Sequence, residues 1–338
     1  MPSDALVALI RCAPATVLAD FERLIKLARF QQQLDPHATL LLRPDARRHF
    51  PFPAANTTPW QLEGVIRALC AAGCRDLTWM SPCTCMVNSA TGKDLNGYEP
   101  ILREYRILPH QTSDIPEPTT NVVLLPTLKT DAVTTIAGAL RCLADQHAPS
   151  HAGWQRQAHE QLADALAAGK QHSQLFAVMD GTTVGIRSGG YASRPEVRNI
   201  LLASTDPLAL DAVAAQIMGL DPLRDVDYLR LGHERGLGVA NPRAIELVGD
   251  ADVARERWVF PRGTLHRRPT ARRLIHLLRG DALERFRWSI AERSVFESWL
   301  RGTAWGRLFA HYQRRGYGRA DDQALPLAES APGDKTGM

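Results

Sequence analysis

The 338-residue sequence has few lysines, few cysteines and no long apolar segment, and each shortage narrows the classes of protein it can encode. No apolar run approaches the roughly 18 residues that a membrane-spanning helix needs, so we expect a chain that does not cross a bilayer. Six cysteines are too few and too irregularly spaced for a disulfide framework in a chain of this length. Only five lysines accompany 35 arginines, which makes each lysine a candidate functional group.

The segment that opens the sequence also lacks the pattern of a secretory signal peptide. Asp4 lies where such a peptide carries positive charge, and the apolar run behind it is only six residues long. Because the cysteines show no disulfide pattern either, we predict a cytoplasmic protein, either free or peripheral to a membrane.

Signatures of common enzyme classes are missing as well. The chain has no phosphate-binding G-x-x-x-x-G-K-[ST] loop and no G-x-S-x-G nucleophile elbow. Gly236-Leu237-Gly238 lacks the third glycine of a dinucleotide fingerprint, and neither His-Glu pair has the second histidine of a zinc-protease helix. The absence of these motifs excludes, at the level of motifs, the common classes of nucleotide-binding protein, esterase and metalloprotease.

Apolar runs of strand length alternate with helical patterns through the first 250 residues. The alternation, with runs that are apolar on both faces, predicts an α/β protein built on a layered, at least partly parallel sheet with helices on both faces. We expect strands near residues 5–10, 39–42, 76–80, 121–125, 175–179, 197–203 and 244–248. We expect helices near residues 16–34, 60–72, 133–145, 154–168 and 207–218.

Charge divides the chain into three segments. Residues 1–250 carry a net charge of −3 and form the expected α/β domain, whereas residues 251–320 contain 16 arginines and carry +10. This second segment interleaves arginine with tryptophan, phenylalanine and leucine, which predicts a basic, mostly helical C-terminal extension. Residues 321–338 carry −3 and are expected to be a disordered tail.

Polar side chains follow several predicted strands, at the edge where open parallel sheets bind ligands. They are Arg43, Asp45, Thr57, Thr58, Lys129, Asp131, Asp180 and Arg187. Lys129, Asp131 and Asp180 are the predicted catalytic groups, with an aspartate as acid or base. The other five are predicted to bind a carboxylate or phosphate, helped by the helix that begins after Thr58. The structural alternatives are a solvated loop for Lys129, an Arg43–Asp45 pair, and a strand-ending turn at Asp180.

Four cysteines near this edge are candidate metal ligands. Cys70 and Cys74 lie one helical turn apart, and Cys83 and Cys85 follow a predicted strand. Four thiolates can hold zinc or an iron–sulfur cluster, but these spacings are unusual for either, and cysteine is often simply buried. We therefore predict no particular cofactor, and an iron–sulfur cluster, a flavin and a metal stay open.

Several short motifs are shared, in the same order, with a known family. They are Arg43-Pro44-Asp45, Asn56-Thr57-Thr58-Pro59, Leu125-Pro126-Thr127-Leu128-Lys129-Thr130, Val178-Met179-Asp180-Gly181, Thr205-Asp206-Pro207-Leu208-Ala209-Leu210-Asp211-Ala212-Val213-Ala214, Met218-Gly219-Leu220-Asp221-Pro222 and Gly236-Leu237-Gly238. Over about residues 38–250, the sequence resembles the domain-of-unknown-function family 362.

The resemblance implies an α/β protein of a conserved fold with no settled biochemical activity. Many relatives are fused to ferredoxin-like modules with iron–sulfur cysteines, which hints at redox chemistry, but this chain has no C-x-x-C-x-x-C run. It has Arg43-Pro44-Asp45 where the family has lysine-proline-asparagine, and Asp131 where the family has histidine. Arg141-Cys142 replaces a lysine-asparagine pair.

Three functions are consistent with the sequence. The first is a cytoplasmic enzyme of small-molecule metabolism that binds an anionic substrate at the sheet edge, with the reaction type unresolved. The second is a non-catalytic accessory protein that docks on an anionic lipid surface or an acidic protein through residues 270–317. The third is a redox protein that holds a metal, cluster or flavin without a recognised motif. No nucleic-acid-binding signature accompanies the arginines, so nucleic acid is not a predicted partner.

Overall fold

The architecture comes from a computed structural model. It describes residues 5–45, 51–52, 54–80, 96–109, 121–131, 133–144, 151–186, 194–258 and 293–317, with the backbone alone for residues 151–156 and 316–317.

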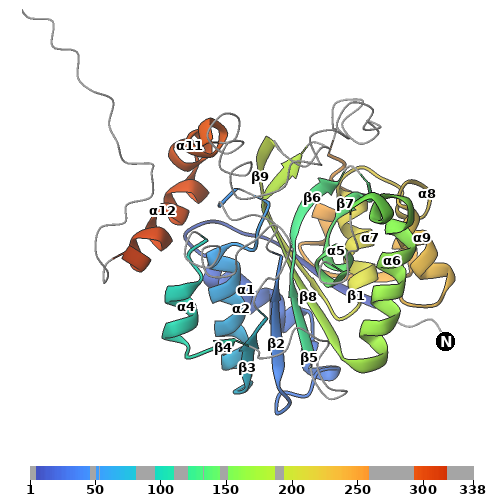
Figure 1. Cartoon of the computed structure of the whole chain (residues 1–338), viewed down its shortest axis with the longest axis horizontal. Coiled ribbons are helices and arrows are strands. Elements are labelled where there is room, and N and C mark those ends of the chain that lie inside the picture. Colours follow the sequence, from blue (N-terminus) through green and yellow to red (C-terminus); the bar gives the residue numbers. More distant parts are fainter. Residues whose placement is uncertain are drawn as a thin grey trace, which may run out of the picture.

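Ten strands of the described chain form one mixed sheet (Figure 1). Their bounds are β1 Ala5–Arg11, β2 Leu40–Pro44, β3 Leu77–Trp79, β4 Leu108–Pro109, β5 Asn121–Leu125, β6 Thr127–Asp131, β7 Thr135–Ala137, β8 Leu175–Ile186, β9 Arg194–Ser204 and β10 Ile245–Gly249. The order across the sheet is β10-β1-β9-β8-β5-β2-β3-β4, and β6 pairs with β8 and with β7. β5 is parallel to both β2 and β8, whereas β9 is antiparallel to β8 and to β1. The expected α/β fold with a partly parallel sheet is confirmed.

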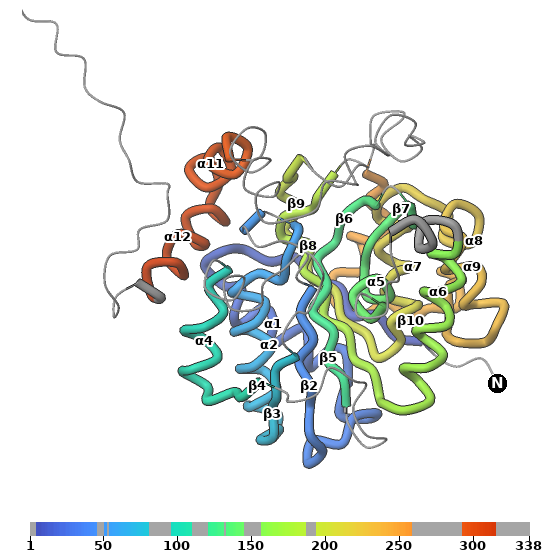
Figure 2. The backbone as a smooth tube through the Cα atoms, viewed as in Figure 1, coloured from blue at the N-terminus to red at the C-terminus, as the bar shows by residue number. Residues whose placement is uncertain are grey.

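Helices cover both faces of this sheet (Figures 1 and 2). They are α1 Val17–Leu27, α2 Pro59–Ala71, α4 Glu99–Glu104, α5 Ala139–Ala144, α6 His151–His172, α7 Pro207–Ile217, α8 Pro222–Asp225, α9 Asp227–Glu234, α11 Arg293–Gly302 and α12 Ala304–Tyr317, with 3-10 turns at Phe30–Gln32, Pro242–Ala244 and Ala251–Arg255. None of the helices in the described ranges is long and apolar enough to span a membrane.

Alternating side chains of the buried strands supply two apolar clusters, one on each face. Leu9 and Met179 join the cluster formed with α5, α6 and α7, whereas Ile10 and Val178 join the cluster formed with α1 and α2. The sheet therefore separates two cores, and a strand residue's position in the alternation decides which helices it meets.

The start of α2 follows from its sequence. Thr58 caps the helix by accepting the backbone N–H of Gln61, and the Gln61 side chain accepts the backbone N–H of Thr58 in return. Pro59 occupies the first turn, where its missing N–H costs no hydrogen bond. Gly73 follows the helix with a positive φ of 97°, as the sequence predicts for a C-terminal cap.

Three sequence-based expectations differ from the structure, and all three concern residues at or near the predicted site. β8 does not end before Asp180 but continues to Ile186, because β9 pairs with it along almost its whole length. Lys129 lies within β6 rather than in a loop. The helix expected from residue 133 begins only at Ala139, because β7 first pairs back onto β6.

The C-terminal helices α11 and α12 pack on the α2 side of the sheet, next to α4 (Figure 2). Phe296, Trp299, Trp305, Phe309 and Tyr312 are buried in the cluster that also contains Trp60 of α2. The apolar stripe of α12 thus faces the α/β core.

Candidate functional site

β2 and β5 are neighbouring parallel strands whose chains leave the sheet toward opposite faces. After β2 the chain enters α2 on one face, and after β5 it passes through β6 and β7 into α5 on the other (Figure 1). The strand order also reverses here, since β3 and β4 continue on the far side of β2 from β5. Such a topological switch point leaves a crevice beyond the carboxyl ends of the two strands, and ligands of open α/β sheets bind there.

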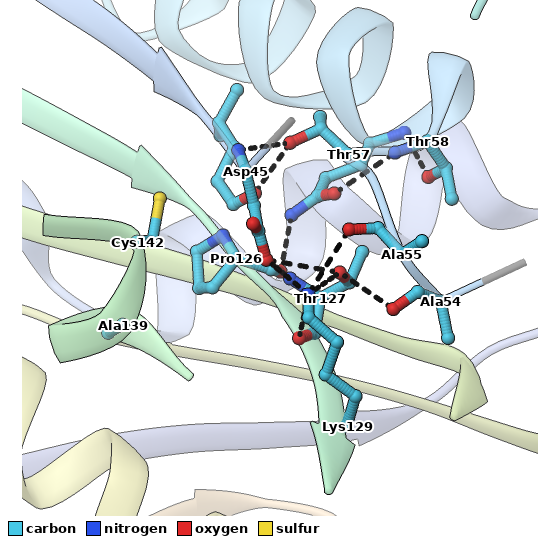
Figure 3. A network of polar contacts seen from close by, with 12 residues as sticks. Asp45, Ala54, Ala55, Thr57, Thr58, Pro126, Thr127, Lys129, Ala139 and Cys142 are labelled. Carbon is cyan, nitrogen blue, oxygen red and sulfur yellow. Dashed lines mark hydrogen bonds and ion pairs between the residues drawn. The ribbon is translucent and has the colours of Figure 1, made fainter. Parts of the chain in front are cut away.

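Lys129 and Asp45 form an ion pair at this switch point (Figure 3). Asp45 follows β2 directly, and Lys129 lies in β6, just beyond the end of β5. Only 1% of the Asp45 side chain and 9% of the Lys129 side chain are exposed. The ammonium also donates to the Thr127 hydroxyl at 2.8 Å and to the Ala55 carbonyl at 3.3 Å. The pair is therefore held by a dense set of polar contacts in a buried setting.

Thr57 ties the end of β2 to the end of β5. Its hydroxyl accepts the backbone N–H of Asp45 at 2.8 Å and donates to the Leu125 carbonyl at 2.7 Å. Its own backbone N–H donates to the Asp45 carbonyl at 2.7 Å. The Thr127 hydroxyl lies 3.3 Å from Asp45 Oδ2, on the Lys129 side. These contacts fix the backbone on both sides of the ion pair.

A second carboxylate, that of Asp180, lies at the N-terminus of α2. Its Oδ2 accepts the Thr58 hydroxyl at 2.5 Å and the Trp60 indole N–H at 3.0 Å, and its Oδ1 accepts the Thr182 backbone N–H at 2.7 Å. Complete burial raises the pKa of Asp180, and these hydrogen bonds oppose that rise because they favour the charged form. Asp180 is therefore easier to protonate than an exposed aspartate.

Gln61 connects the two carboxylate positions. Its amide nitrogen donates to the Pro126 carbonyl at 3.0 Å, between β5 and β6, and to the Val178 carbonyl of β8 at 2.8 Å. The structure thus brings together Asp45, Thr57 and Lys129 on one side of the α2 N-terminus, with Thr58 and Asp180 on the other. The predicted anion-binding groups already hold two carboxylates of the protein itself.

Of the three other predicted ligand-binding and catalytic residues, the structure describes Arg43 and Asp131. Arg43 is buried in β2, and its carbonyl faces the Cys142 thiol of α5 at 3.7 Å. Asp131 closes the turn between β6 and β7, where its Oδ1 accepts the N–H groups of Val133 at 2.8 Å and Thr134 at 2.9 Å. Arg187 lies outside the described residues. The functional roles assigned to these three residues stay predictions.

The cysteine cluster is described only in half. Cys70 and Cys74 are free thiols at the end of α2, and burial raises the pKa of each, which disfavours the metal-binding thiolate. Cys83 and Cys85 lie outside the described residues. Within the part of the chain that is described, no group of three or more His, Cys, Asp or Glu side chains is arranged to hold a metal ion.

Sequence reasoning missed four residues that build the site. Thr127, Trp60 and Gln61 contact the two carboxylates or join their strands, and buried Tyr98 donates its hydroxyl to the Thr57 carbonyl at 2.5 Å. A glutamine in the first turn of an apolar helix is a signal that such a side chain bonds to backbone nearby. Tyr98 carried no comparable signal, because its partner is 41 residues away.

A family model described as "Domain of unknown function (DUF362)" matches residues 111–216. No curated protein and no solved structure matches the chain. The matched range includes Thr127, Lys129 and Asp180, whereas Asp45 and Thr57 precede it. The resemblance predicted from the short motifs is thus confirmed for this range, and residues 111–216 are DUF362-like.

Proposed function

We propose that the chain is a cytoplasmic enzyme of small-molecule metabolism that binds a carboxylate or phosphate substrate at the switch point between β2 and β5. One observation carries the proposal: the buried Lys129–Asp45 pair lies at the topological switch point of the sheet, the position at which open α/β sheets generally bind ligands.

A contribution to the stability of the fold is a weak explanation for a buried Lys129–Asp45 ion pair. Desolvating two charges costs several kcal/mol, and well-packed apolar residues often replace a buried ion pair with no loss of stability. The chain nevertheless places one of its five lysines here, together with Thr127 of β6 and with Thr57 and Thr58 at the start of α2. Hydroxyl groups, an ammonium and a helix N-terminus are a common receptor for an anion.

In this proposal, Asp45 is the resting partner of Lys129. A substrate carboxylate or phosphate replaces the Asp45 oxygen as the partner of the Lys129 ammonium and accepts a hydrogen bond from the Thr127 hydroxyl. Asp45, released from Lys129, is then a carboxylate beside the bound substrate and accepts a proton from it. Burial raises the pKa of Asp180, so this second carboxyl group takes up a proton more readily than an exposed aspartate, and its protonated form does not repel the anion.

Calorimetric titration of the full chain with inorganic phosphate and with malonate tests the binding step. Lys129→Met keeps the length of the side chain and removes its charge, so we expect binding about 10–100-fold weaker. Asp45→Asn removes the competing carboxylate, and we expect binding at least about tenfold tighter. Lys170→Met, at an exposed position of α6, is the matched control and is expected to bind as the wild type does.

The proposal is wrong if neither anion binds to the wild type or to Asp45→Asn. It is equally wrong if Lys129→Met binds both anions as tightly as the Lys170→Met control. Circular dichroism spectra of each variant at the titration temperature establish that the chain under test is folded.

The second candidate function, an accessory protein that docks through its basic C-terminus, has one supporting observation. Arg307, His311 and Arg314 lie on the exposed side of α12, opposite its buried aromatic residues. This face fits an anionic lipid surface through charge alone, because the apolar stripe is already packed. Co-sedimentation with vesicles of phosphatidylserine is expected to fall in the Arg307→Ala/Arg314→Ala variant, and unchanged sedimentation would remove this candidate.

A further inference from the structure

Trp60 contacts both the candidate site and the C-terminal helices. Its indole N–H donates to Asp180 Oδ2 at 3.0 Å. The other side of the same ring system meets Trp305 at a centroid distance of 5.2 Å, Phe309 at 6.5 Å and Tyr312 at 6.4 Å. One side chain thus connects a buried carboxylate to a helix more than 240 residues further along the chain.

Polar contacts hold the C-terminal helices in one position on this part of the sheet. The Trp305 indole donates to Asn199 Oδ1 of β9 at 2.7 Å, and the Trp299 indole donates to the Thr183 hydroxyl of β8 at 3.3 Å. At the other end of α12, Arg315 pairs with Glu63 of α2 at 3.0 Å and with Glu104 at the end of α4 at 2.9 Å. Apolar packing alone tolerates sliding, whereas these bonds specify the register of α12 on α2.

Asn199 and Thr183 both lie just beyond the Asp180–Leu201 pair, on the same side of it, within the β8–β9 pair. Gly181 pairs with Ile200, and Thr183 pairs with Val197, so both indole contacts fall beside the irregularity that follows Asp180. The helices therefore cover the strand segment that carries the carboxylate, from the side opposite α5 and α7.

We propose that α12 is a working part of the candidate site: by packing on Trp60 it holds the indole N–H on Asp180 Oδ2 and excludes water from that carboxylate, and so sets how readily Asp180 takes up a proton beside the N-terminus of α2. The inference rests on the proposed function, since it assigns Trp60 and Trp305 as positioning residues for Asp180, the second carboxylate of that site.

The Trp60 hydrogen bond and the cover by α12 have opposite effects on the pKa of Asp180. The indole N–H stabilises the charged carboxylate, so its loss raises the pKa of Asp180 further. The cover supplied by α12 maintains the desolvation that raises this pKa, so its loss lowers the pKa toward the ordinary value. Thr58, Trp60 and Thr182 donate hydrogen bonds to Asp180. Cys12, which follows β1, is a titratable group that interacts electrostatically with it: the pKa of Cys12 is raised chiefly by burial and also by the Asp180 charge.

Carbon-13 NMR of the full chain, labelled at the aspartate carboxyl groups and titrated without any added anion, measures this directly. Asp180→Asn assigns the Asp180 signal. Trp60→Phe keeps an aromatic ring but removes the N–H, and we expect its Asp180 titration to move up in pH by about half a unit or more. Trp305→Ala is expected to move it down by a similar amount. Trp305→Phe, which keeps most of the apolar cover, is expected to restore most of the wild-type value.

Trp258→Ala is the matched control, because Trp258 is a buried tryptophan like Trp305 of α12 but belongs to the apolar cluster on the other face. The inference is overturned if the Asp180 titration is unchanged in Trp60→Phe and Trp305→Ala. It is also overturned if Trp258→Ala and Trp305→Ala move it equally. If Trp305→Ala does not fold, Phe309→Leu replaces it, with the same expected direction. Because no ligand is present, this outcome is independent of whether phosphate and malonate bind.

Discussion

At the Lys129–Asp45 pair, each charge compensates the other in a place that water hardly reaches. We expect Lys129→Met and Asp45→Asn each to lower the free energy of unfolding by about 3–5 kcal/mol, because each leaves a buried charge without its partner. The double variant, which removes both charges, is expected to lose clearly less than the sum. Urea denaturation measures all three free energies.

Lys170→Met is the control for removing a lysine in an exposed position, with an expected change within about 0.5 kcal/mol. Additive losses in the double variant would show that the two charges do not interact in the folded chain. A small loss in both single variants would show that the pair is solvated.

We expect Asp211 of α7 to make the stability of the protein depend on pH. It is fully buried and accepts the N–H groups of Ala139 at 2.6 Å and Leu140 at 3.1 Å, and the Tyr228 hydroxyl at 3.1 Å. Burial raises its pKa to about 7, above the value of 3.8 for an exposed aspartate. Between these values the unfolded chain has released the proton that the folded chain still holds, so stability falls as pH rises through this window.

Comparison of the wild type with Asp211→Asn isolates this contribution. The wild type is expected to lose up to about 4 kcal/mol relative to the variant between pH 4 and pH 7, with little further relative change above pH 8. Denaturation curves at one-unit pH intervals give the difference. Parallel pH profiles for the two proteins would contradict a raised pKa at Asp211.

Among elements, α2 depends most on one polar side chain. The Gln61 side chain donates hydrogen bonds to two carbonyl groups, those of Pro126 and Val178, in addition to its role in the helix cap. Gln61→Met has a similar shape but removes both hydrogen bonds. The Pro126 carbonyl still accepts the Asp180 backbone N–H at 2.9 Å, so we expect the variant to cost about 1–3 kcal/mol. Thermal unfolding of this variant against Gln31→Met, at an exposed glutamine beyond α1, measures the loss. Equal melting temperatures would show that water reaches these carbonyls.

The same element shows how far sequence patterns reach. Thr58, Pro59 and Gly73 mark the start and end of α2 correctly, because capping depends on residues that are close in the sequence. β6 was missed, because Thr127–Asp131 is short and polar and becomes a strand only through pairing with β7 and β8. The strand at residues 175–179 was expected to end before Asp180 for the same reason, since β9 extends β8 beyond the point where its apolar run ends.

At the scale of the whole molecule, the order of the strands in the sheet determines which residues meet at the candidate site, and the sequence did not predict that order. Residues that follow strands were identified from the chain, and Asp45, Thr57 and Lys129 do meet. Their meeting depends on β2 and β5 being neighbours, although β3 and β4 separate them in sequence. The partnership of Trp60 with Asp180 spans 120 residues and likewise follows from tertiary packing alone.

Packing of α11 and α12 into the cluster with α1 and α2 makes the C-terminal helices part of one folded unit. We expect calorimetric unfolding of the full chain to show one cooperative transition, because exposing Trp305 and Phe309 also uncovers Trp60. An early separate transition that disappears in a variant with Trp299 and Trp305 replaced by alanine would contradict this, since it would mean that the helices unfold by themselves.

The most direct measurement of the central claim is the side-chain nitrogen-15 NMR spectrum of lysine-labelled protein during titration with phosphate or malonate. Only five lysines contribute, and Lys129→Met assigns the signal of interest. We expect a Lys129 ammonium signal that exchanges slowly with water before titration, because the group is buried and hydrogen-bonded, and that moves on addition of either anion while the Lys170 signal stays constant. A Lys129 signal that is unchanged at saturating anion would contradict the assignment of Lys129–Asp45 as the substrate-binding pair.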